Sequence, residues 1–308
     1  MNTSQVVGLR RLSRLFACTA SAAGVAPTGC IARIVLLGLL AVALLFGAPA
    51  RAQIDEAAAE RLMRSSGLWD QLGATAAGAR AGIEAAAKNR LTALSDEEVQ
   101  RLLKATDAAF AAETLRPAVR RALAARVPPG DLEALDAWLG GDLGRRITAL
   151  EVAASRPDRD SERAIRAGIS RLAAAPEARK KLIENLVEST RAAEAITNMT
   201  INVAVAVQRG MASVKPEGPV APVATLREAF EAQRAQMQRA YGGMSQALFA
   251  DMYQALSDAE LAGYLEFLRG AAGRQFLEAT MQAMEHALVD AAERLGSRLP
   301  AVRPGPNT

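Results

Sequence analysis

A sequence pattern that occurs twice constrains the architecture of this chain more than any other feature. Residues 127–154 and 256–283 both read as a turn, an acidic residue, a leucine-rich stretch, an aromatic–leucine pair and Gly-x-x-Gly-Arg. They align without a gap, 129 residues apart. The aligned pairs are Asp131 with Glu260, Leu132 with Leu261, Leu135 with Tyr264, Trp138 with Phe267, Leu139 with Leu268, and Ile147 with Phe276. Such a repeat predicts two related structural units, and it does not indicate which reaction, if any, the protein catalyses.

The centre of each copy predicts a helix–GxxG–helix hairpin. Gly141 and Gly270 stand where the first helix ends, and there we expect a left-handed C-terminal residue. Gly144 and Gly273 open the second helix, where the missing Cβ lets two helices approach closely. We interpret the motif as a structural turn. A phosphate cradle is the alternative, which a Gly-x-x-Gly without a preceding strand supports poorly.

An arginine follows each motif. We expect Arg145 and Arg274 to reach the last carbonyls of the preceding helix or a nearby acid.

The remainder of the chain also predicts helices. Ala, Leu, Arg, Glu and Gln are abundant, and strand-like alternation is absent. Capping boxes begin at Ser95 and Ser257, each followed three residues later by glutamate. Apolar residues recur every three or four positions from Leu182 to Val207, which predicts one helix of about 30 residues. The expected fold is all-α, with two tandem related helical-bundle halves that each end in a glycine hairpin.

Proline and glycine divide this helical chain. The predicted first half covers residues 53–157 and the second covers 158–300, meeting near 156–176. Three prolines at 216, 219 and 222 predict a surface loop over 214–224. Residues 301–308 are expected to be a disordered tail.

The N-terminus predicts export. Residues 34–46 form an uncharged apolar run after Arg33, and small residues follow it up to Ala52. This is the layout of a secretory signal peptide over residues 1–52, with cleavage after Ala52 to leave Gln53 as the new N-terminus. Cleavage after Ala50 is the close alternative. The competing interpretation is an uncleaved signal anchor that holds the protein in the inner membrane, facing the periplasm. The predicted location is otherwise periplasmic or secreted.

Removing the leader changes the charge balance. Residues 1–52 hold five of the 37 basic residues and no acid, so 32 basic and 33 acidic residues remain. A nucleic-acid partner is therefore not expected, because phosphate binding needs a basic excess. The clusters around Arg116 and Arg179 are interpreted as solvated helix faces. Both cysteines lie in the leader, which leaves no thiol for a disulfide, a metal or catalysis.

Candidate catalytic, metal-binding and cofactor-binding residues are lacking in this sequence. His286 is the only histidine, and we expect it on the solvent side of the last helix, near Asp290. Paired carboxylates at 96–98 and 258–260 stand in first helical turns, where the helix dipole explains them. We therefore predict a protein that is not an enzyme and carries no cofactor. A hydrolase, the remaining enzymatic hypothesis, would depend on His286.

One segment resembles a known family. Residues 256–276, LSDAELAGYLEFLRGAAGRQF, combine a Ser-acid cap, a Glu-Leu pair, an aromatic position at Phe267 and the glycine at Gly273. This arrangement is similar to the domain-of-unknown-function family numbered 2059, helical domains of exported bacterial proteins. The resemblance extends less closely to the first half. It implies an exported α-helical protein and brings no catalytic residues.

Two binding functions follow from these features. The preferred hypothesis is a non-enzymatic periplasmic protein that interacts with an unidentified protein or maintains the cell envelope, close to the membrane. The alternative is a lipid or other apolar small molecule held between amphipathic helices, with the helix from Leu182 to Met211 as one wall and the proline-rich loop as a lid. A core poor in aromatic residues also predicts either modest stability or a homodimer.

Overall fold

The computed structural model describes residues 53–88, 95–214 and 222–298, and these residues form helices and short connections without a strand. This confirms the predicted all-α class. The predicted leader with Ala52, the centre of the proline-rich loop and the predicted tail lie outside the described residues. The helices before residue 156 are α2 (Glu56–Ser65), α3 (Leu68–Lys88), α4 (Asp96–Ala109), α5 (Ala112–Ala124), the short 3-10 helix η1 (Pro129–Asp131), α6 (Leu132–Gly140) and α7 (Asp142–Ala154). Those after it are α8 (Ser161–Ala174), α9 (Glu177–Thr190), α10 (Ala192–Val214), α11 (Val223–Met252), α12 (Asp258–Arg269) and α13 (Ala271–Arg298).

Local signals set several of these boundaries. Ser95 accepts a hydrogen bond from the backbone of Glu98, whose side chain accepts one from the backbone of Ser95, and Ser257 and Glu260 repeat the arrangement. Both predicted capping boxes are thereby confirmed. Pro128 precedes η1, so the chain turns before α6 as the Pro-Pro-Gly sequence predicts.

The predicted long helix after Leu182 is wrong. The chain breaks between α9 and α10 at Arg191, which adopts a left-handed conformation with φ of 50°. The apolar periodicity continues through the break, so the sequence pattern does not reveal where α9 ends. Gly67, with φ of 73°, is the other residue with positive φ in the described part of the chain. It ends α2, as Arg191 ends α9.

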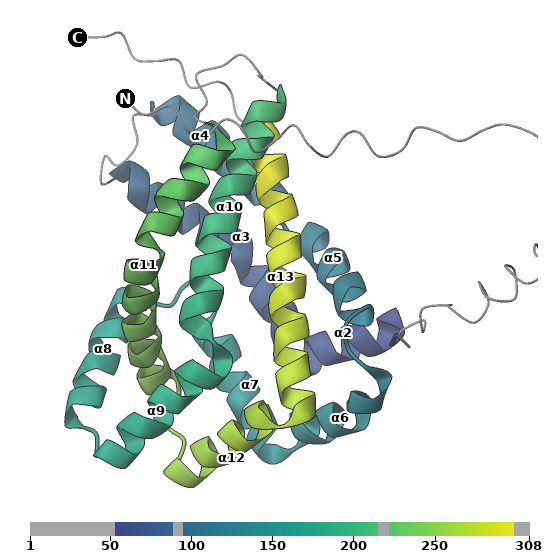
Figure 1. The fold of residues 1–308 in the computed structure, drawn as a ribbon, viewed down its shortest axis with the longest axis vertical. Helices are drawn as coiled ribbons and strands as arrows, with labels where there is room; N and C mark the ends of the chain where they lie inside the picture. The colour runs from purple at the N-terminus through teal and green to yellow at the C-terminus, as the bar shows by residue number, and fades with distance from the viewer. Residues whose placement is uncertain (1–52, 89–94, 215–221, 299–308) are drawn as a thin grey trace, which may run out of the picture. The chain divides into compact units, whose positions relative to one another are not determined.

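The helices pack around two adjacent cores (Figure 1). The larger core takes residues from α2, α3, α5, α6, α10 and α13, so both predicted halves contribute to it. The smaller core joins α7, α9 and α12 and includes Tyr253 and Leu256 from the turn after α11. In Figure 1, α10, α11 and α13 run alongside one another, and α6, α7, α9 and α12 gather at their lower end.

Small residues let the long helices approach closely. A Cβ atom built on Gly210 of α10 would overlap the backbone of α13, and one on Gly296 of α13 would overlap the backbone of α10. Buried alanines on another face of α13, at Ala279, Ala283, Ala287 and Ala291, belong to the larger core. The aromatic-poor sequence therefore forms its core by close helix packing, in which backbone contacts replace large side chains.

Both glycine hairpins, α6–Gly141–α7 and α12–Gly270–α13, adopt the same backbone geometry. Gly141 (φ −72°, ψ 160°) and Gly270 (φ −63°, ψ 160°) are extended, so the expected left-handed conformation at these residues is wrong. The chain turns without it because the second helix starts at once. The close approach expected at Gly144 and Gly273 is present.

Each of these two glycines packs against the end of the preceding helix in its hairpin. A Cβ on Gly144 would overlap the carbonyl of Trp138, and one on Gly273 would overlap that of Phe267. The following arginines return to the preceding helix: Arg145 donates to the carbonyl of Gly140, and Arg274 donates to that of Arg269 at 3.0 Å. Arg145 also pairs with Asp142.

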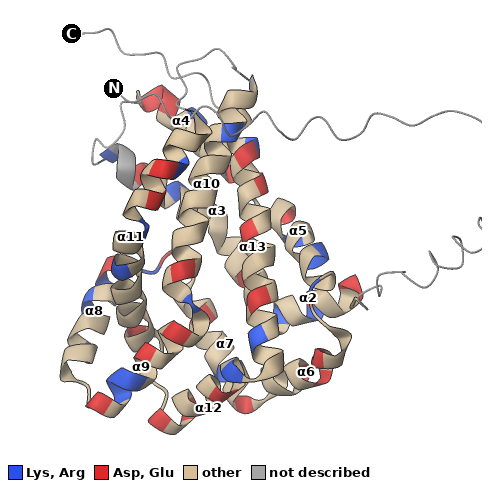
Figure 2. Cartoon of the chain, in the orientation of Figure 1, with Lys and Arg blue, Asp and Glu red and all other residues tan. Residues whose placement is uncertain are grey.

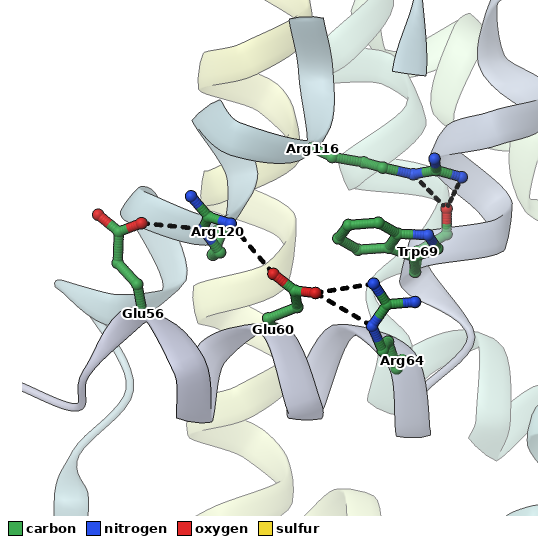
Figure 3. Close-up of polar contacts among 6 residues, drawn as sticks. All are labelled: Glu56, Glu60, Arg64, Trp69, Arg116 and Arg120. Carbon is green, nitrogen blue, oxygen red and sulfur yellow. Dashed lines mark hydrogen bonds and ion pairs between the residues drawn. The ribbon is translucent and has the colours of Figure 1, made fainter. Parts of the chain in front are cut away.

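Residues of both charges are interspersed along the helices (Figure 2). One cluster joins α2, α3 and α5 (Figure 3): Arg120 pairs with Glu56 and Glu60, and Arg64 pairs with Glu60. These hydrogen bonds, first from Arg64 and then from Arg120, lower the pKa of Glu60.

The same cluster fixes the corner between α2 and α3. Arg116 donates two hydrogen bonds to the carbonyl of Trp69, at 3.0 and 3.1 Å, and Arg64 and Arg116 lie 3.9 and 4.4 Å from the indole centroid (Figure 3). Arg116 is therefore a packing residue, and its interpretation as part of a solvated face is wrong. Thr148 of α7 also donates to the carbonyl of Ser65, at 3.3 Å.

Among the described helices, none combines the length and the hydropathy that a bilayer-spanning segment needs.

A pair of glycine substitutions tests the packing of the hairpins. We expect Gly273→Ala to lower the free energy of unfolding by about 1–3 kcal/mol, because the added methyl overlaps a backbone carbonyl that cannot rotate away. Gly243→Ala on α11 is the matched control: its Cβ would meet no atom within 4 Å, so the helix should gain about 0.5–1 kcal/mol. Urea denaturation measures both. Equal effects of the two substitutions would contradict the packing role.

Candidate functional site: a buried carboxyl in an aromatic cavity

A cavity of about 410 Å³ lies between the two glycine hairpins, and we call it the hairpin cavity. Its walls come from α6, α7, α12, α13, the end of α11 and the α2–α3 corner, with Thr190 from the end of α9. The lining residues are Ser66, Leu68, Gln71, Trp138, Leu139, Gly144, Ile147, Thr148, Glu151, Ala154, Ser155, Thr190, Phe249, Met252, Tyr253, Tyr264, Phe267, Leu268, Gly273, Phe276, Leu277 and Thr280.

The repeated sequence supplies matched walls. On α7 the lining residues Gly144, Ile147, Thr148 and Glu151 are spaced i, i+3, i+4 and i+7, which places them on one helix face. The residues 129 positions later, at the start of α13, line the same cavity: Gly273, Phe276, Leu277 and Thr280. The aligned pairs Trp138 with Phe267 and Leu139 with Leu268 also line it. Both copies of the motif therefore contribute the same positions to one cavity.

Glu151 is the one carboxylate in the cavity lining. The hydroxyls of Tyr253 and Tyr264 both donate to its Oε1, at 2.7 and 2.9 Å. Its Oε2 makes no hydrogen bond to any described residue, and the side chain is half-buried and lines the cavity. A carboxyl oxygen that makes no hydrogen bond within the protein can accept one from a polar group in the cavity.

Burial shapes the ionisation of this cluster. Desolvation raises the pKa of Glu151, and the hydrogen bonds from Tyr253 and Tyr264 oppose the rise without cancelling it. Burial also raises the pKa of both tyrosine hydroxyls well above the usual value, so they remain hydrogen-bond donors.

Five aromatic rings form a continuous series along the cavity. The rings of Trp138 and Phe267 stack with centroids 4.4 Å apart. Trp138 also stacks with Tyr264, with centroids 6.2 Å apart. Tyr253 meets Tyr264 edge to face at 5.9 Å, and Phe249 meets Tyr253 at 5.5 Å. Contacts of this kind contribute about 0.5–1.5 kcal/mol each beyond burial, so the series stiffens the wall.

An arginine from α9 holds the turn that carries Tyr253. Arg179 donates to the carbonyls of Tyr253 and Leu256, at 2.9 and 2.8 Å, and pairs with Asp258 at 2.8 Å. Its side chain is 17% exposed, so the expectation of a solvated position is wrong for Arg179. The bonds fix the chain between α11 and α12, and with it the direction of the Tyr253 hydroxyl.

Some of the residues selected from the sequence line this site, and others do not. Gly144 and Gly273 line the hairpin cavity, whereas Gly141, Gly270, Arg145 and Arg274 lie outside its lining. His286 also lies outside it: its side chain is 63% exposed, and it sits 3.6 Å from Asp290, the expected neighbour. The structure therefore does not bring the histidine to the candidate site.

Sequence reasoning missed the central residues, Glu151, Tyr253 and Tyr264. A signal for Glu151 is present, because it continues the face of Gly144, Ile147 and Thr148 while being acidic. Nothing in the sequence pairs it with two tyrosines more than 100 positions away.

The described residues contain no group of three or more His, Cys, Asp or Glu side chains placed to hold a metal ion. No family model, curated protein or solved structure matches this chain. The resemblance to the domain-of-unknown-function family numbered 2059 stays a prediction.

The raised pKa of Glu151 predicts how stability depends on pH. Between the ordinary glutamate pKa and the raised one, the folded protein binds more protons than the unfolded chain, so the free energy of unfolding falls as pH rises through this window. Glu151→Gln cannot ionise and should lose this part of the dependence. Urea denaturation over a pH series tests it, with Glu133→Gln at an exposed site on α6 as the control. A glutamine variant with the wild-type pH profile would contradict the assignment.

Proposed function

We propose that the protein binds an apolar small molecule in the hairpin cavity and does not convert it chemically. The observation that carries the proposal is the combination of an aromatic-lined volume of about 410 Å³ with one buried carboxyl whose Oε2 has no partner among the described residues. Small-molecule sites are typically mostly apolar cavities of about 300–1,000 Å³ with few polar groups that orient the ligand.

The arrangement favours binding over catalysis. Glu151 lies against two tyrosine hydroxyls that stabilise it through hydrogen bonds, and no histidine, lysine or arginine lines the cavity to transfer a proton or stabilise developing negative charge. This site differs from the apolar-ligand site that the sequence suggested. Among the described residues, helices α9 and α10 contribute only Thr190 to the lining.

The preferred hypothesis from the sequence, interaction with another protein, has less support from the described surface. Ile169 on α8 is the only large hydrophobic residue that is exposed among the described residues, at 57%. A stable protein interface normally needs a larger apolar centre. The same observation weakens the case for a homodimer, which stays a prediction.

We also propose that the two hairpins arose by duplication of one helical unit. Gly67 and Arg191, which end α2 and α9, are the two residues with positive φ in the described chain, and each follows one copy of the similar segments 60–66 and 184–190. In both units the hairpin glycines contact equivalent carbonyls. Duplication would explain why the cavity lies between two walls built from equivalent positions.

A pair of substitutions on α7 tests the binding site. Ala154 lines the cavity and Ala153, its neighbour, is exposed and does not. We expect the purified protein to increase the fluorescence of prodan, an uncharged naphthalene fluorophore. Ala154→Phe should weaken that binding about tenfold by filling the volume, and Ala153→Phe should leave it unchanged. Absence of binding to the wild type, or equal effects of both variants, would overturn the proposal.

The location of the protein is a further part of the proposal. We propose that it is exported and cleaved after Ala52. Intact-mass measurement of the protein recovered from the periplasm should then give a chain that begins at Gln53. A mass that retains the whole leader would favour the membrane-anchored alternative, and a chain that begins at Arg51 would favour cleavage after Ala50.

A further inference from the structure

The charge in the hairpin cavity restricts what a ligand can carry. This inference rests on the proposed function, since it concerns the chemistry of the same site. Glu151 is the only acidic residue in the lining, which contains no lysine, arginine or histidine. An anionic ligand would be repelled by the carboxylate at low local dielectric, whereas a cation would be attracted to it.

The aromatic wall has the same preference. The chain has two Trp, three Tyr and seven Phe, and half of these residues line this one cavity: Trp138, Phe249, Tyr253, Tyr264, Phe267 and Phe276. The face of an aromatic ring carries negative potential and attracts cations. A ring face that meets the ligand and the carboxylate of Glu151 would both favour a cation over an anion.

The hydrogen bonds of Glu151 leave one of its carboxylate oxygens available to such a ligand. Both tyrosine hydroxyls donate to Oε1, so Oε2 remains available to accept from an N–H group. We propose that the hairpin cavity selects apolar amines, bound as ammonium ions with Glu151 as the counterion and the aromatic series as the wall.

Binding of an ammonium ion should be linked to proton release. Burial raises the pKa of Glu151 in the empty cavity and a bound cation lowers it, so at a pH between these two pKa values binding of the ammonium ion releases a proton to solvent. The other titratable groups in the lining are the hydroxyls of Tyr253 after α11 and Tyr264 on α12. The walls from α2–α3, α6, α9 and α13 carry no charge.

Three ligands of one shape test the proposal: phenylethylammonium, the neutral phenylethanol and the anionic phenylpropionate. Calorimetric titration of the purified protein should show the ammonium ion binding about tenfold more tightly than the alcohol, and the anion most weakly. The affinity for the ammonium ion should rise with pH until Glu151 is ionised in the empty cavity, and that for the alcohol should not. The probe stays protonated over this range, as a lysine amine does.

Two variants separate the role of charge from that of folding. Glu151→Gln keeps the size of the side chain and should remove the preference for the ammonium ion over the alcohol, a difference of about tenfold in affinity. Tyr264→Phe keeps the ring and removes one donor to Oε1, so it should move the pH dependence of ammonium binding to higher pH. An unchanged helical circular dichroism spectrum and urea denaturation show that each variant is folded.

The outcomes distinguish this inference from the proposed function. Equal affinity for the ammonium ion and the alcohol, or an unchanged preference for the ammonium ion in Glu151→Gln, would overturn the selection of amines. Prodan binding that responds to Ala154→Phe would still support an apolar ligand. If the wild type binds neither prodan nor any of the three ligands, both proposals are overturned.

Discussion

The stacked contact between Trp138 and Phe267 joins the two glycine hairpins, and the hairpin cavity depends on it. The two rings are nearly parallel, at 4°, with centroids 4.4 Å apart. Each ring belongs to a residue whose carbonyl packs against a hairpin glycine, Gly144 or Gly273. The backbone contact within each hairpin thus sets where its ring lies, and the contact between the rings sets how the hairpins face each other. The cavity is the space that this geometry leaves between α7 and α13.

The position of Glu151 conflicts with what stability alone would favour. A carboxyl among aromatic rings loses solvation, and the hydrogen bonds from Tyr253 and Tyr264 offset only part of that loss, as its raised pKa indicates. A polar group kept at such a cost is typical of a functional site. The repeat adds a contrast: the equivalent position on α13 is Thr280, whose buried Oγ1 has no hydrogen-bond partner among the described residues. Polar groups therefore occupy both walls of an otherwise apolar cavity.

Local chemistry explains which predictions were correct. Capping boxes at Ser95 and Ser257 act over three residues, and the close approach at Gly144 depends on a turn of a few residues, so both are readable from the sequence. The break at Arg191 was missed because a single residue with positive φ leaves the apolar periodicity intact. Arg116 and Arg179 were misinterpreted because their partners are backbone carbonyls, at Trp69 and Tyr253, which no sequence pattern marks.

The sequence by itself determined the helical class, the two glycine hairpins and the lack of a histidine or cysteine cluster, because helix propensity, capping and residue counts are local properties. Only the tertiary structure decided that both hairpins line one cavity. It also decided that Glu151 meets two tyrosines 102 and 113 residues away. The physical reason is that helix periodicity specifies which face of a helix is buried but not which other helix covers it. That choice depends on close contacts, such as those at Gly144, Gly273 and the stacked rings, which exist only once the chain has folded.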